Sequence, residues 1–113
     1  MQMFDVNALQ QPTWPVKLGD PDQTVVHLSY PTVDLLERIM AVAPEIEEVA
    51  KKKDGAVIRA LYGVIADVMN CNDDGYTFTA EELRDKYRMS LLVIAQFVAG
   101  YFDFIDQANN AKN

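Results

Sequence analysis

Apolar and polar residues alternate in two short stretches near the start of the chain, on either side of the turn-rich sequence GDPDQ. The apolar members of these stretches are Trp14, Val16, Leu18, Val26, Leu28 and Tyr30. A period of two is typical of strands that bury one face. Residues 14–30 are therefore predicted to form a β-hairpin with both apolar sets on the same face, and Pro15 suits an edge strand.

From residue 32 onward the apolar residues recur at helical spacing. Thr32 is a predicted N-cap for a first helix, which Pro44 ends or kinks. A second short helix follows, with glutamates first and lysines last, the charge order that the helix dipole favours. Residues 56–69 are apolar on most sides, and such a helix is normally buried.

Two further helices complete the predicted bundle. Thr79 and Glu82 have the spacing of a capping box, and Ser90 is a predicted cap for a last helix through about Ala108. The predicted class is α+β, mostly α, with an N-terminal β-hairpin followed by a bundle of four to five helices. We expect a single domain over residues 1–113. Its parts are an N-terminal segment (1–13), the hairpin (14–30), the helical bundle (32–108) and a frayed tail (109–113).

The composition of the chain limits the classes of partner that it can bind. The net charge of −7 argues against nucleic acid and against an anionic membrane surface, because both attract lysine and arginine. A single cysteine excludes an internal disulfide and fits a reducing cytoplasm. No signal peptide is visible. The most apolar stretch, residues 91–105, is interrupted by polar residues and is expected to fall short of a membrane span.

The stretch NCNDDGYTFTAEEL has the spacing of an EF-hand calcium loop. The candidate ligands at loop positions one, three, five and twelve are Asn70, Asn72, Asp74 and Glu81. However, the first position lacks the usual aspartate, the neighbouring aromatic residues are out of phase, and the sequence has no partner loop. Asn, Asp and Gly also form turns, and the capping box explains the rest. We therefore predict no metal and no cofactor.

No catalytic arrangement can be assembled from the sequence. His27, the only histidine, falls on the outer face of the predicted hairpin. Cys71 has acidic neighbours, which do not activate a thiol. The prediction is a protein that is not an enzyme.

The last helix carries apolar residues on more than one stripe. Either it is central and covered on all sides, or part of it contacts another protein. Two central helices are hard to cover in a small domain, so we expect self-association or a partner groove. The candidate contact residues, chosen for hydrophobicity, are Phe97, Tyr101, Phe102 and Phe104.

The order of these features resembles that of the tail assembly chaperones of long-tailed bacteriophages and prophages. The resemblance rests on FDVNAL, WPVKL with VVHLSYPTVDLL, MNCNDDGYTFTAEEL and VAGYFDFIDQANNAKN. It implies a homo-oligomeric binding protein of the bacterial host cytoplasm. Such a protein binds the tape measure protein, keeps it soluble while tail tube subunits assemble around it, and is then displaced. The implied partners are the tape measure protein and the tail tube protein, with no nucleic acid and no membrane.

Two other functions fit the sequence. One is a calcium-binding, EF-hand-like module, which depends on residues 70–81 alone. The other is a small acidic adaptor or inhibitor that presents carboxylates to a basic partner. A salt titration distinguishes the acidic adaptor from a chaperone. Binding of an apolar client should resist added salt, whereas docking through carboxylates should weaken steeply.

Overall fold

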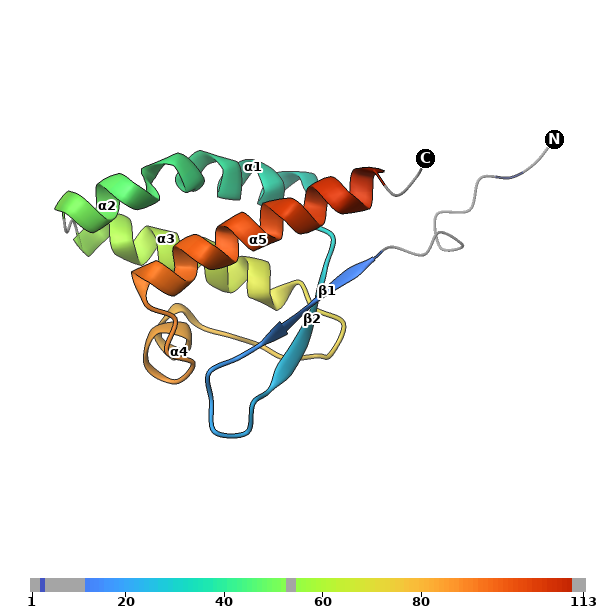
Figure 1. The fold of residues 1–113 in the computed structure, drawn as a ribbon, viewed down its shortest axis with the longest axis horizontal. Helices are drawn as coiled ribbons and strands as arrows, with labels where there is room; N and C mark the ends of the chain where they lie inside the picture. Colours follow the sequence, from blue (N-terminus) through green and yellow to red (C-terminus); the bar gives the residue numbers. More distant parts are fainter. Residues whose placement is uncertain (1–2, 4–11, 53–54, 111–113) are drawn as a thin grey trace.

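The computed structural model describes Met3 and residues 12–52 and 55–110. Its elements are β1 (Thr13–Lys17), β2 (Val25–Ser29), α1 (Val33–Val42), the 3₁₀ turn η2 (Ala43–Glu45), α2 (Ile46–Lys52), α3 (Gly55–Asn70), α4 (Ala80–Asp85) and α5 (Leu91–Asn110). The predicted α+β class is confirmed: an antiparallel hairpin precedes the helices (Figure 1).

The predicted ends of the chain fall mostly outside the described residues. This applies to almost all of residues 1–13 and to residues 111–113. Residues 109 and 110 were expected to fray, but α5 continues through Asn110. The hydroxyl of Tyr30 donates to Oδ1 of Asn109 at 2.9 Å, which ties this end of the helix to the hairpin.

β1 and β2 form the predicted hairpin. The ladder pairs Trp14 with Leu28 and Val16 with Val26. Both apolar sets therefore share one face, as the alternating pattern predicts. Val26 and Leu28 are fully buried, so this face is turned toward the helices.

Pro15 lies opposite His27 in the ladder, and the backbone of His27 points away from β1. Its amide donates to the carboxylate of Asp74 at 2.6 Å, and its carbonyl accepts from the amide of Asp73 at 3.0 Å. Bonded and non-bonded pairs alternate along an antiparallel ladder, so the nitrogen of Pro15 faces the open side of β1. Because proline has no N–H at a position that does not face β2, Pro15 leaves every hydrogen bond of the ladder intact. Pro15 therefore lies in an edge strand, as predicted.

Local signals set the boundaries of α1. The side chain of Thr32 accepts from the amide of Leu35 at 3.2 Å, which confirms the predicted N-cap. Pro44 lies in η2, where the α-helical hydrogen bonding is interrupted before α2. The buried residues of α1 are Leu35 and Ile39.

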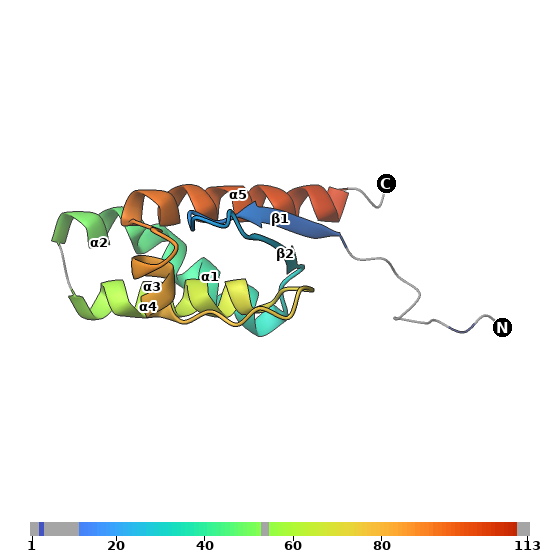
Figure 2. The same cartoon turned by 90° about the horizontal axis from the view of Figure 1, so that it is seen from below.

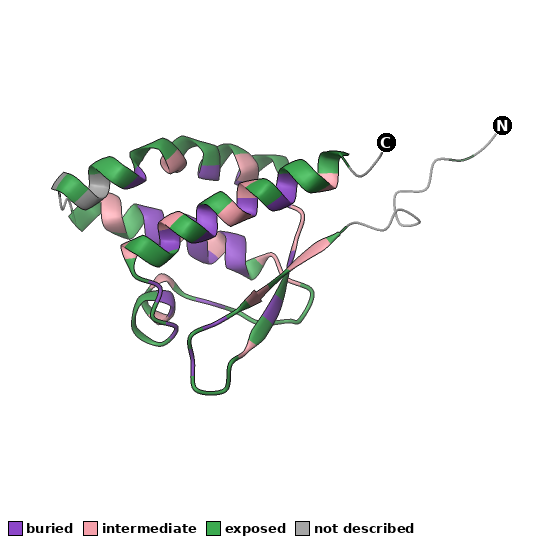
Figure 3. Ribbon diagram, in the orientation of Figure 1, coloured by how far each residue is buried: buried purple, intermediate pink, exposed green. Residues whose placement is uncertain are grey.

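α3 supplies one wall of the core. α5 and β1 lie side by side along one side of the molecule, and α3 lies along the opposite side (Figure 2). The prediction that residues 56–69 are buried on most sides holds from Leu61 onward, whereas residues 55–60 are half-buried or exposed (Figure 3). The buried residues of α3 are Leu61, Tyr62, Val64, Ile65, Ala66, Val68 and Met69.

The caps of the last two helices are as predicted. The hydroxyl of Thr79 accepts from the amide of Glu82, and the Glu82 side chain accepts from the amide of Thr79, both at 3.1 Å. This reciprocal pair is the complete capping box of α4. At the start of α5, the side chain of Ser90 accepts from the amide of Val93 at 3.3 Å.

By length and composition, α5 is apolar enough to cross a membrane, so the expectation that this stretch falls short was wrong. The reason is that Asp103 and Asp106 are the only charged residues between 91 and 110. Its buried residues are Ile94, Phe97, Val98, Tyr101, Phe104 and Ile105. These side chains belong to the same hydrophobic core as α3 and the hairpin, so α5 is consistent with a core helix of a soluble protein.

Substitution of two helical glycines by alanine is expected to change the free energy of unfolding in opposite directions. A Cβ at Gly63 in α3 would meet nothing within 4 Å, whereas a Cβ at Gly100 in α5 would lie 2.9 Å from the ring of Trp14. We expect Gly63→Ala to raise the free energy of unfolding by about 0.5–1 kcal/mol, because alanine is the better helix former. Gly100→Ala should lower it by about 1–2 kcal/mol, because Trp14 must move. Urea unfolding measures both, and shifts of the same sign would contradict the packing at Gly100.

Candidate functional site

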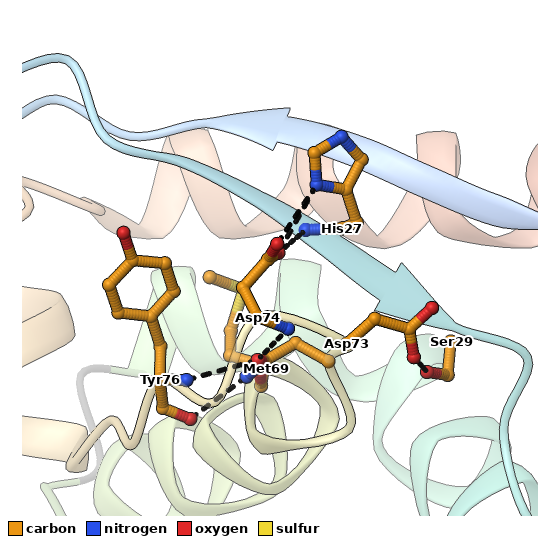
Figure 4. A network of polar contacts seen from close by, with 7 residues as sticks. His27, Ser29, Met69, Asp73, Asp74 and Tyr76 are labelled. Atoms are coloured by element: carbon orange, nitrogen blue, oxygen red, sulfur yellow. Dashed lines mark hydrogen bonds and ion pairs between the residues drawn. The ribbon is translucent and has the colours of Figure 1, made fainter.

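The connection between α3 and α4 folds against the outer edge of β2 (Figure 4). Leu28 and Asn72 form an isolated antiparallel bridge, and the amide of Ser29 donates to the carbonyl of Cys71 at 2.8 Å. The hydroxyl of Ser29 donates to Asp73 at 2.8 Å. The connection thus extends the hairpin by a short third segment.

Asn72 organises this connection from within. Its Oδ1 accepts from the amides of Asp74 at 3.0 Å and Tyr76 at 3.1 Å. Its Nδ2 donates to the carbonyls of Met69 at 2.8 Å and Tyr76 at 2.9 Å. Gly75 has a φ of 77°, a left-handed conformation that glycine adopts without strain. The side-chain amide therefore replaces the backbone partners that the turn lacks.

The candidate calcium ligands are engaged in the same turn. Oδ1 of Asn70 accepts from the amide of Phe78 at 2.6 Å, and its Nδ2 donates to the carbonyl of Phe78 at 3.1 Å. The carboxylate of Asp74 accepts from the His27 amide, and Glu81 is exposed on α4. Among the described residues, no group of three or more His, Cys, Asp or Glu could hold a metal ion. This geometry supports the interpretation as a turn and a cap, and calcium binding stays an alternative that only a binding measurement can test.

His27 and Ser29 lie on the outer face of β2, but they do not form a catalytic pair. The hydroxyl of Ser29 donates to Asp73, while Nδ1 of His27 lies 3.2 Å from Oδ2 of Asp74. No hydrogen bond from Ser29 to His27 prepares the serine as a nucleophile. The hydrogen bond from the His27 amide holds the pKa of Asp74 below its usual value. These contacts fasten the connection to the hairpin, and the His27 side chain is 47% exposed, as expected for a surface residue.

Trp14 covers the aromatic stripe of α5. Its ring centroid lies 5.3 Å from that of Phe97, 6.0 Å from that of Tyr101 and 6.2 Å from that of Phe104. These three rings are at most 9% exposed, and Phe102 is half-buried. Of the candidate contact residues Phe97, Tyr101, Phe102 and Phe104, the three whose rings face Trp14 are therefore covered within this chain, and their role in partner binding stays a prediction. Their helical spacing reveals the stripe, but it does not reveal the distant ring that covers it.

Tyr101 is also fully buried, and its hydroxyl has no hydrogen-bond partner among the described residues. Burial raises the pKa of this phenol, so it stays neutral at physiological pH. Its ring lies within the aromatic cluster, which gives Tyr101 a packing role.

The exposed apolar side chains lie elsewhere. Val33, Leu36 and Met40 form a stripe on α1, which we call the α1 ridge; Leu36 is half-buried, and Val33 and Met40 are 74% and 56% exposed. At the start of α5, Leu92 and Val93 are also exposed. The signal for the α1 ridge was present in the sequence as an i, i+3, i+7 spacing beside the buried positions.

A groove of about 560 Å³ runs between β1, the α4–α5 connection and the first turns of α5. We call it the β1–α5 groove. Its walls include the rings of Trp14 and Phe97 and the side chain of Val93. Its charged residues are Lys17 and Arg88. Of the predicted contact residues, only Phe97 lines this groove.

Comparison of the chain with protein-family models, with curated proteins and with solved structures gives no match. The function must therefore be argued from the chain's own residues and their geometry.

Proposed function

We propose that this protein is a tail assembly chaperone of a long-tailed bacteriophage or prophage and acts in the cytoplasm of the bacterial host. It binds the tape measure protein and keeps it soluble while tail tube subunits assemble around it. It is not an enzyme, it forms homo-oligomers on its client, and the tail tube protein is its second partner. The α1 ridge is the observation that carries this proposal.

The α1 ridge has the geometry of a helix-binding surface. Val33, Leu36 and Met40 follow one another at i, i+3 and i+7, the spacing with which one helix packs against another. A different stripe of α1, made of Leu35 and Ile39, is the part of this helix that is buried in the core. Val33 and Met40 remain exposed and contribute little to folding, so their burial is available to a client. Fully burying each would contribute about 1.5–3 kcal/mol.

The rest of the molecule is consistent with a carrier of an apolar, helical client. The net charge of −7 keeps a protein with exposed apolar residues soluble and disfavours binding to nucleic acid. The resemblance in the order of sequence features points to the tape measure protein as the client.

The test is co-expression with the tape measure protein encoded in the same genome, followed by measurement of the soluble client. We expect the natural chain to keep the client soluble and the double variant Val33→Asp, Met40→Asp to lose most of that effect, because aspartate cannot be buried under an apolar client. Ala41→Asp is the control, since it places an aspartate on an exposed position of α1 outside the ridge.

Circular dichroism melts of the three proteins show whether each variant is folded. A double variant that is folded and still solubilises the client would contradict the proposal. So would a gene neighbourhood without tail tube and tape measure genes. A complex that dissociates steeply with added salt would instead favour the acidic adaptor, because apolar contacts are not screened.

A further inference from the structure

The β1–α5 groove is a built hollow. Its lining residues Gly19 and Tyr87 are closely packed, because a Cβ at Gly19 would lie 2.8 Å from the carbonyl oxygen of Tyr87. Trp14 and Phe97 are in ring contact and line the groove together, and Val93, which is 39% exposed, also lines it. The hollow has a volume of about 560 Å³, and its aromatic wall is the half-buried ring of Trp14 with the largely covered ring of Phe97 beside it.

The charge of the groove is opposite to that of the protein. The charged residues that line it, Lys17 and Arg88, are exposed cations, whereas the whole chain has a net charge of −7. No acidic residue is among its lining residues. Asp20, beside Gly19, is buried, and its two carboxylate oxygens accept from the amide and hydroxyl of Thr24 at 2.9 and 2.6 Å. This cationic rim would attract carboxylates.

Arg88 lies in a tight turn of the α4–α5 connection. Arg88 has a φ of 58°, a left-handed conformation that glycine or asparagine adopts more easily than arginine. The amide of Met89, the next residue, donates to the carbonyl of Leu83 at 2.9 Å, which holds the turn. A residue that strains the backbone at the rim of a groove is a candidate for a binding role.

We propose that the β1–α5 groove docks a segment of a partner protein that carries both apolar side chains and carboxylates. The apolar side chains contact Trp14, Phe97 and Val93, and the carboxylates pair with Lys17 and Arg88. Because Pro15 removes a donor from the open edge of β1, side chains rather than strand pairing supply the affinity. This surface is separate from the α1 ridge, and the inference does not depend on the proposed function.

Trp14 is the only tryptophan of the chain, so its fluorescence reports occupancy of the groove directly. The probe is a synthetic peptide, Gly-Asp-Leu-Asp-Phe-Asp-Leu-Gly, and its partner has lysine in place of every aspartate. We expect the acidic peptide to shift the Trp14 emission in a saturable way and to bind at least about tenfold more tightly than the basic peptide, as expected when like charges oppose association.

Arg88→Glu and Lys17→Glu should each weaken binding of the acidic peptide by about two- to fivefold, the range of exposed ion pairs. Arg59→Glu is the control, since it reverses the same charge on an exposed position of α3 away from the groove. Equal binding of the two peptides, or equal losses in all three variants, would overturn the proposal. Light scattering that shows a smaller oligomer for Arg88→Glu would also overturn it, because a second copy would then occupy the groove.

Discussion

Trp14→Ala is expected to lower the free energy of unfolding by about 2–4 kcal/mol, somewhat less than the truncation of a fully buried aromatic residue, because Trp14 is half-buried. The ring contacts Phe97, Tyr101 and Phe104 and also packs on Gly100. It is the largest aromatic contact between the hairpin and α5, beside the contacts of Tyr30 with Phe104 and Asn109. Since a domain of this kind has a total stability of roughly 5–15 kcal/mol, this single change would leave it close to unfolding.

Urea unfolding followed by circular dichroism measures this loss, because the variant has no tryptophan to report it. Trp14→Phe should lose less, since it retains part of the ring contact. The matched control is Tyr76→Ala, which removes an aromatic ring that is 45% exposed. We expect Tyr76→Ala to change the free energy of unfolding by no more than about 0.5 kcal/mol. A loss below about 1 kcal/mol for Trp14→Ala would mean that the hairpin is not held by this ring.

Asn72→Asp is expected to lower the free energy of unfolding by about 2–3 kcal/mol. The carboxylate keeps the acceptors for Asp74 and Tyr76, but it loses both donors and places an oxygen against the carbonyls of Met69 and Tyr76. A calcium site predicts the reverse, because an aspartate at the third loop position adds the charge that a calcium ion favours.

Thermal unfolding with and without calcium distinguishes the two interpretations. In the turn interpretation the Asn72→Asp variant melts at a lower temperature, and calcium does not restore it. Thr77→Asp, which adds a charge at an exposed position of the same connection, should change the melting temperature little. A variant that calcium stabilises beyond the natural chain would establish the metal site.

Local patterns were sufficient for most boundaries, because they depend on neighbours within a few residues. The capping oxygens of Thr32, Thr79 and Ser90 reach amides only three residues away. Pro44 interrupts its helix through its own ring and its missing amide hydrogen. Such signals depend on few distant contacts, and in this structure each of them is formed.

The candidate site was predicted less well, because its geometry joins residues far apart in the chain. The aromatic spacing on α5 could not show that Trp14 covers it, and the large apolar residues that α5 does expose are Leu92 and Val93. The EF-hand spacing of residues 70–81 could not show that His27 would engage Asp74. Spacing describes which residues share a face, but it does not describe what lies opposite that face.

By itself, the sequence determined the α+β class, the hairpin with its single buried face and the caps of the helices, since short-range hydrogen bonds and periodicity decide these. Only the tertiary structure decided which apolar stripes are covered. It buried the rings of α5 beneath Trp14, left Val33 and Met40 in solvent, and brought Lys17 and Arg88 to one groove. The physical reason is that burial depends on contacts between distant segments, and a core needs only one apolar stripe of α1 to close.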